Sequence, residues 1–91
     1  MSDYDPIVTA LRHEINVLDR QLLAAINRRL EVVKRLHEHK GVTGMPLRDL
    51  DREVAMLRAL EADNAGPLSP EGVASFFTDV IELTRQEMYG E

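Results

Sequence analysis

The chain has 91 residues and no cysteine, which indicates one small domain with a limited core and excludes disulfides and thiolate metal sites. Its eleven basic and sixteen acidic residues give a net charge of −5, and this balance argues against nucleic acid as the main partner because phosphate binding needs a basic surface. No run approaches the roughly 20 apolar residues of a membrane span, and no basic start precedes an apolar stretch, so we expect a cytoplasmic protein without a membrane partner.

The composition favours an all-helical fold, because Leu, Ala, Glu and Arg are abundant and aromatic residues make up only 4%. After a short frayed tail at residues 1–4, one uninterrupted helix is predicted over residues 6–40. Asp5 stands at the N-cap and Pro6 at the first helical position, where its missing N–H is not needed. Residues 7–40 contain neither Gly nor Pro, and Gly41 is expected to end the helix.

This first helix predicts a dimer. Its apolar residues recur at intervals of three and four, which marks a buried seam: Leu11, Ile15, Leu18, Leu22, Ala25, Val32, Val33 and Leu36. At about 1.5 Å per residue the helix is roughly 52 Å long, whereas a globule of this chain length is about 30 Å across. A second copy is the simplest cover for the far end. We therefore expect an intertwined homodimer whose sites draw on both chains.

Two shorter helices are predicted to follow. Residues 41–46 form a turn segment with two glycines and a proline. A second helix is expected over residues 47–62, with an inner stripe of Leu50, Val54, Leu57 and Leu60. Residues 63–67 break it, and Ser69 and Pro70 start a third helix that runs to residue 89. The third helix is expected to bury Val73, Phe76, Phe77, Val80, Ile81, Thr84 and Met88. We interpret residues 1–91 as a single domain of three helices.

Arg29 and Lys40 occupy the seam of the first helix, where apolar residues would be expected. Eleven residues of helix return to within about 20° of the same direction, so the two cations share a face and lie roughly 16 Å apart. With Val33 and Leu36 between them they could flank a small anionic ligand. Alternatively, Arg29 extends to solvent or pairs with a glutamate, and Lys40 only favours the helix C-terminus.

Other charged residues cluster on the second helix. Asp49, Arg52 and Glu53 lie at i, i+3 and i+4 and share a face, and an ordinary surface ion-pair cluster is the alternative interpretation. Arg12 points about 100° away from the Arg29 face. It cannot serve the same pocket within one chain, but an antiparallel partner helix could supply it.

The chemistry available to such a site is restricted. The three histidines, His13, His37 and His39, point in different directions, and we interpret them as solvated. No Ser-His-Asp or Cys-His arrangement and no Gly-rich phosphate loop is present. An enzyme built from this chain would use neither a metal, a cofactor nor a covalent nucleophile, and would depend on electrostatics and orientation.

Three segments resemble the all-helical (type II) chorismate mutases. They are residues 11–19 (LRHEINVLD) with 22–29 (LLAAINRR) and Lys40, residues 46–53 (PLRDLDRE), and residues 76–84 (FFTDVIELT). The matches keep their order and spacing over nearly the whole chain. The resemblance implies an intertwined homodimer of three-helix chains that rearranges chorismate to prephenate, on the route to phenylalanine and tyrosine.

The resemblance also implies roles for the charged residues. Arg12 would enter from the partner chain and bind a substrate carboxylate, and Arg29 would bind a carboxylate within its own chain. Lys40 would contact a carboxylate and the ether oxygen, where negative charge grows as the C–O bond breaks.

Further site residues implied by the resemblance lie on the second and third helices. The backbone N–H of Asp49 and the side chain of Glu53 would hold the ring hydroxyl. Arg52 would support the anionic end of the ligand, and Thr84 stands where the family usually has Ser near the ring carboxylate.

Met88 departs from the family pattern. The family usually has Gln, or sometimes Glu, at this position as a second donor to the ether oxygen, and a thioether cannot donate. The expected result is either a slow mutase in which Lys40 acts alone, or activation by a partner that reshapes the C-terminal turn. Two alternatives remain: a ligand-sensing module that regulates or is activated by a partner such as DAHP synthase, and an isochorismate pyruvate-lyase.

Overall fold

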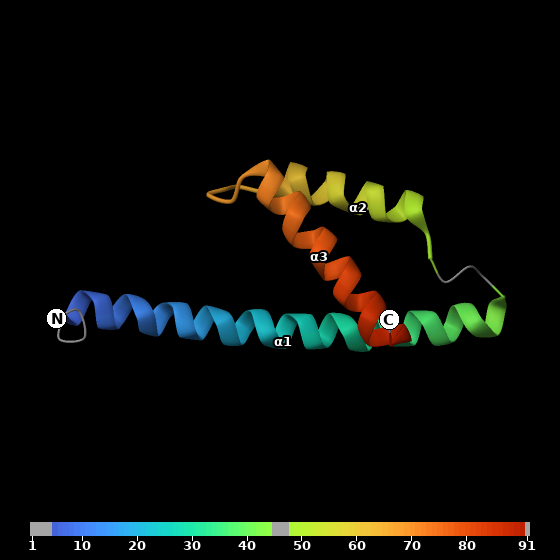
Figure 1. Cartoon of the computed structure of the whole chain (residues 1–91), viewed down its shortest axis with the longest axis horizontal. Coiled ribbons are helices and arrows are strands. Elements are labelled where there is room, and N and C mark those ends of the chain that lie inside the picture. Colours follow the sequence, from blue (N-terminus) through green and yellow to red (C-terminus); the bar gives the residue numbers. More distant parts are fainter. Residues whose placement is uncertain (1–4, 45–47, 91) are drawn as a thin grey trace. The chain divides into compact units, whose positions relative to one another are not determined.

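The computed structural model describes residues 5–44 and 48–90 (Figure 1). These ranges contain three helices and no strand: α1 (Pro6–Thr43), α2 (Leu50–Asp63) and α3 (Pro70–Tyr89). The predicted all-helical class is confirmed. The tail at residues 1–4, the turn residues Met45 and Pro46, and the predicted helix start at Leu47 lie outside the described residues. The chain forms two compact units, one up to Val33 and one from Lys34 onward.

The start of α1 was predicted correctly, but its end was not. One carboxylate oxygen of Asp5 accepts from the backbone N–H groups of Ile7 (2.9 Å) and Val8 (3.3 Å), as an N-cap should. The helix continues through Gly41 to Thr43, and Gly44 is the residue with a left-handed φ of 74°.

The extension of α1 has a local cause. The Thr43 hydroxyl donates to the carbonyls of His39 and Lys40, each at 3.2 Å. The Lys40 carbonyl is among the last four of the helix, which lack an intrahelical N–H partner. A glycine inside a helix costs only about 1 kcal/mol relative to alanine, so Gly41 does not compel the helix to stop.

The start of α2 lies later than predicted. Arg48 and Asp49 precede the helix, which begins at Leu50 and ends at Asp63. Asp49 is the N-cap, because its backbone is extended and its carboxylate accepts from the Arg52 N–H at 3.0 Å. Aspartate is among the best N-cap residues, and this competing bond explains why the helix does not begin before it.

Hydrogen bonds from side chains and from the backbone hold the loop after α2 and cap both ends of α3. Asn64 donates to the Leu68 carbonyl (2.7 Å) and accepts from the Gly66 N–H (3.0 Å). Ser69 accepts from the Gly72 N–H at 3.0 Å, which confirms the predicted start at Pro70. Gly90, with a left-handed φ of 72°, ends the helix and donates to the Gln86 carbonyl.

The small core lies where α3 packs against α2. Val73 is 3% exposed, and Val80 and Thr84 are also buried; these three were predicted correctly. Phe76, predicted to be buried, is 46% exposed, and its ring meets Phe77 edge-on at 5.1 Å. The remaining predicted core positions of α3 are only half-buried: Phe77, Ile81 and Met88.

The predicted inner stripe of α2 is only partly covered. Leu57 and Leu60 are half-buried, whereas Leu50 and Val54 are exposed. Leu50 points within about 20° of Leu57 around the helix, so the helix face does not explain the difference. Leu50 is the first residue of α2, and the half-buried Leu57 and Leu60 lie in its second half.

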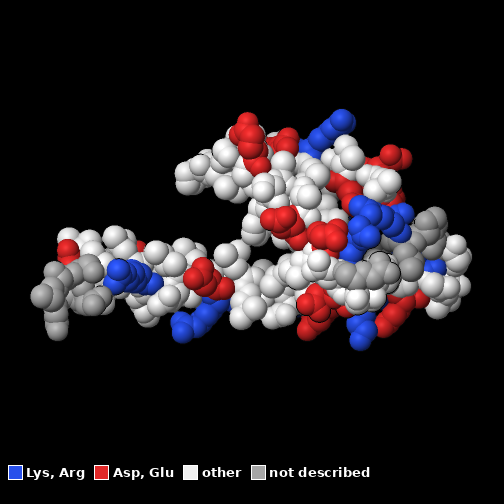
Figure 2. Space-filling view, in the orientation of Figure 1, with Lys and Arg blue, Asp and Glu red and all other residues white. Residues whose placement is uncertain are grey.

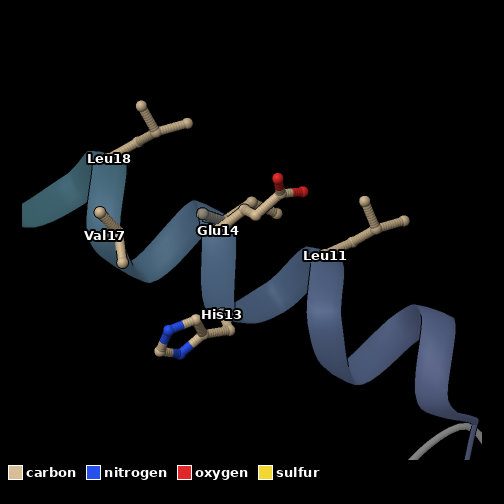
Figure 3. A pocket seen from close by; sticks show the side chains of 6 residues that line it. Leu11, His13, Glu14, Val17 and Leu18 are labelled. Atoms are coloured by element: carbon tan, nitrogen blue, oxygen red, sulfur yellow. The ribbon is translucent and has the colours of Figure 1, made fainter.

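The apolar seam of α1 is likewise uncovered in the single chain. No described residue of α1 is buried, and Leu18 and Leu22 are 56% and 57% exposed. Around Leu18 the helix surface forms a shallow apolar pocket, in which Leu11 and Leu18 extend to the same side of the helix and His13 lies away from them (Figure 3). Among residues 5–44 and 48–90, no helix is both long and apolar enough to cross a membrane.

The core position Val73 is expected to matter far more for stability than an exposed valine. Val73→Ala removes two buried methyl groups and should lower the free energy of unfolding by about 1–3 kcal/mol. Val42→Ala is the matched control, because Val42 is 87% exposed and its loss should change that free energy by no more than about 0.5 kcal/mol. Urea unfolding followed by circular dichroism, at one protein concentration, measures both. Equal losses would contradict the assigned core.

Candidate active site

The two cations predicted on the seam of α1 are both half-buried. Arg29 lies in the first compact unit and Lys40 in the second. From the middle of α1 onward, the half-buried positions recur every three or four residues: Ile26, Arg29, Leu30, Val33, His37 and Lys40. Both cations lie on this stripe, together with Val33, whereas Val32 and Leu36 of the predicted seam are exposed. Charge held partly out of water interacts more strongly with an anion than charge on an open surface.

Arg12 has a different environment on the same helix. Arg12 is exposed. It follows Leu11 in the sequence, and Leu11 is one of the residues that line the apolar pocket of Figure 3. This position was predicted to serve a partner chain rather than its own. The structure holds a single chain, so that role remains a prediction.

The start of α2 brings three predicted site residues together. The carboxylate of Asp49 is engaged with the Arg52 N–H, so this side chain serves the helix start. Asp49 is not itself helical, which corrects the expectation that it shares a helical face with Arg52 and Glu53. The structure therefore leaves Glu53 as the carboxylate of this group that faces another side chain.

Glu53 is held by an arginine that the sequence analysis did not single out. The Arg48 guanidinium donates to both carboxylate oxygens of Glu53, at 3.0 Å from Nε and 3.2 Å from the terminal nitrogen. The hydrogen bond to Glu53 raises the pKa of Arg48 above its usual value, and an arginine is protonated at physiological pH in any environment. A bidentate arginine fixes the plane of a carboxylate. Acidic and basic side chains are interspersed over the face shown in Figure 2.

Thr84 and Met88 lie one turn apart on α3. Thr84 is buried, and its hydroxyl donates to the Val80 carbonyl at 2.7 Å. This bond fixes the orientation of the threonine side chain. Met88 is half-buried and offers a polarizable thioether that can accept a hydrogen bond weakly but cannot donate one.

His37 was predicted to be solvated, and that prediction is wrong. His37 is half-buried and its ring stacks on Tyr89, with centroids 5.5 Å apart and planes 15° from parallel. The Tyr89 hydroxyl lies 3.2 Å from His37 Nδ1. The other two histidines, His13 and His39, are exposed. No periodicity relates two residues 52 positions apart, so the sequence offered no signal for this pair.

The described part of the chain contains no cluster of side chains that could bind a metal ion. Residues 5–44 and 48–90 hold no group of three or more His, Cys, Asp or Glu side chains arranged to bind an ion. The chemically useful groups in these ranges are instead guanidinium, ammonium and carboxylate side chains. Such groups bind and orient anions.

The curated proteins similar to this chain are much longer than it is, and each matches it over only a part of its own length. The T-protein of Haemophilus influenzae is 40% identical over 81 residues, which are 87% of this chain and 20% of that protein. The bifunctional chorismate mutase/prephenate dehydratase of Neisseria gonorrhoeae is 36% identical over 77 residues, 85% of this chain and 21% of that protein. The chain thus spans about a fifth of the length of these relatives.

A similar solved structure and a family match also point to chorismate mutases. Form I of the chorismate mutase from Thermus thermophilus superimposes with a TM-score of 0.83 at 28% identity, covering 85% of this chain and 96% of that one. Residues 11–89 match the family described as chorismate mutase type II. That match includes every predicted site residue, from Arg12 to Met88. The chain belongs to the chorismate mutase type II family.

Proposed function

We propose that this chain catalyses the rearrangement of chorismate to prephenate, in the cytoplasm, as a step toward phenylalanine and tyrosine. The observation that carries the proposal is the family match over residues 11–89, within which Arg29 and Lys40 lie on the half-buried stripe of α1. The reaction is a unimolecular pericyclic shift, so it needs no base, nucleophile, metal or cofactor. It needs a pocket that binds two carboxylates and holds the reactive folded conformer.

The cations supply that pocket in an otherwise acidic protein. Arg29 binds one carboxylate through its guanidinium fork, a geometry that suits planar anions. Lys40 contacts the other carboxylate and the ether oxygen. Negative charge grows on this oxygen in the transition state, so a donor placed there lowers the barrier more than it stabilises bound chorismate.

The ring hydroxyl is bound at the start of α2. Glu53 accepts a hydrogen bond from this hydroxyl with the lone pairs that the bidentate Arg48 leaves available, since a carboxylate has about four acceptor positions. Arg48 supports this function by fixing the carboxylate plane. The Asp49 N–H and Arg52 complete this end of the site, and Thr84 lies near the ring carboxylate.

The site is completed by a second copy of the chain. The α1 seam exposes Leu11, Ile15, Leu18 and Leu22 by half or more, and fully burying a leucine side chain contributes about 1.5–3 kcal/mol. A paired α1 helix covers this seam. It also brings Arg12 of one chain to the site of the other chain.

Removing either cation tests the proposed function directly. Arg29→Ala and Lys40→Ala are each expected to lower turnover of chorismate by a factor of about 10²–10³ or more, with the dimer still folded. The neighbouring exposed cations Arg28 and Lys34 provide matched controls, because Arg28→Ala and Lys34→Ala remove the same charge from the same helix. Chorismate consumption and prephenate formation are measured together with molecular mass in solution. A wild-type chain without turnover, or full activity in Arg29→Ala or Lys40→Ala, would refute the assignment.

Met88 sets the expected rate. Met88→Gln introduces a second donor where the family usually has one, and turnover should rise because the ether oxygen then receives two hydrogen bonds. Met88→Leu is the matched control, since it preserves volume without adding a donor. Steady-state kinetics with chorismate compares the three chains. An unchanged rate in Met88→Gln would show that this position does not face the ether oxygen.

The same residue supports a second candidate function, a module that senses the ligand and acts with a partner such as DAHP synthase. Its signature is tight chorismate binding with weak turnover that rises when DAHP synthase is added. Release of pyruvate from isochorismate would instead indicate the lyase activity.

The shared site predicts complementation between two inactive chains. Arg12→Ala and Arg29→Ala homodimers should each be inactive, because each lacks one carboxylate-binding cation at every site. A mixed dimer has one site that lacks both cations and one site that has both, so mixing the two variants should restore up to about a quarter of wild-type activity under random exchange. Subunit exchange is verified by native mass spectrometry of tagged chains. Demonstrated exchange without recovered activity would rule out the cross-chain site.

A further inference from the structure

The C-terminal end of α3 is joined to α1 by one aromatic pair within the second compact unit. The Tyr89 ring lies almost parallel to that of His37, 5.5 Å away, and its hydroxyl is 3.2 Å from His37 Nδ1. Tyr89 is the last residue of α3, and Gly90 ends the helix immediately after it. Helix ends open most readily, so a contact at this position decides where the last turn of α3 lies.

Both partners are neighbours of residues in the proposed site. His37 precedes Lys40 by three residues on the half-buried stripe of α1, so the two side chains lie on adjacent turns of one face. Tyr89 follows Met88 directly, and Thr84 lies one turn before Met88. Holding Tyr89 to His37 therefore fixes how the Thr84–Met88 turn stands relative to the turn that carries Lys40.

We propose that His37 and Tyr89 form a positioning pair, which holds the last turn of α3 against α1 and thereby sets the geometry between Lys40 and the Thr84–Met88 face. This inference rests on the proposed function for the identity of the ligand. The pair does not touch the reacting atoms. It acts through Lys40 and Met88, in a reaction whose rate depends on how well a single conformer is held.

The hydrogen bond matters more to this role than burial does. Tyr89 remains substantially exposed, so its stacking removes little apolar surface from water. The bond from the hydroxyl to Nδ1 requires the imidazole proton on Nε2, and the opposite tautomer reverses donor and acceptor. In either form the bond fixes both the distance and the rotation of the two rings, which stacking alone does not.

Tyr89→Phe separates the hydrogen bond from the stack. We expect kcat to fall by a factor of about 10 to 100, the effect of a misplacement near 1 Å, with a smaller change in KM and an unchanged melting temperature. His37→Phe should lower kcat similarly, and the double variant should be no worse than either single one. His37→Asn should recover part of the rate, because its amide can occupy the place of Nδ1. His39→Phe, at an exposed position on the same end of α1, is the matched control.

Amide hydrogen exchange on the full chain supplies a readout that does not depend on turnover. In Tyr89→Phe the backbone N–H groups of residues 86–90 should exchange faster, while those around Val73 stay protected. If the wild-type chain does not convert chorismate, the proposed function fails while faster exchange still supports the pairing. With an active wild type, an unchanged kcat in Tyr89→Phe would overturn the positioning role. So would a double variant whose loss of kcat equals the losses of the two single variants combined. Unchanged exchange would overturn the pairing itself.

Discussion

The uncovered apolar seam of α1 is the constraint on which the rest of this chain depends. A 38-residue helix with no buried residue adds little to the stability of a single chain, because most helical stability in proteins comes from packing an apolar face. The buried core of α3 comprises Val73, Val80 and Thr84, and folding must offset roughly 1–2 kcal/mol of backbone entropy for every residue that it orders. In the proposed homodimer, pairing α1 with a second copy would supply the missing burial. The stability of the fold and the completeness of the proposed site would then have the same cause.

An acidic protein that is proposed to bind a dianion must place its cations locally, and the end of α1 accounts for one of them. Lys40 lies in the last turn of α1, where a positive charge is favoured by the helix dipole. At the start of α2, Asp49 is used for capping and Glu53 is held by Arg48. Both carboxylates are therefore already engaged within the start of α2.

Local signals were readable from the sequence, and long-range ones were not. Asp5 and Ser69 are short-range caps and were predicted correctly. The helix was wrongly predicted to end at Gly41. The hydroxyl of Thr43, two residues later, donates a hydrogen bond to the Lys40 carbonyl, which a glycine turn would otherwise have to provide with a donor. Phe76 fits the same helical periodicity as Val73, yet Val73 is 3% exposed and Phe76 46%, a difference set by tertiary packing and not by periodicity. The bond between His37 and Tyr89 depends on the path of the intervening helices, for which no local pattern exists. The cations of the proposed site were predicted because charge on an apolar seam is a local anomaly, whereas Arg48 lies outside any helix and gave no such signal.

The presence of Met88 makes the held geometry more important than it would be with a second donor. Two donors directed at one oxygen restrict its position from two sides, so that small shifts of either helix are tolerated. A single lysine has a flexible four-carbon stem and an ammonium that can rotate freely, and it defines the position of the oxygen poorly. In the proposed site the missing restriction must then come from the backbone that carries Lys40 and from the turn opposite it. His37 and Tyr89 join these two segments, and their contact provides a physical means by which a site with one ether-oxygen donor can still be preorganised.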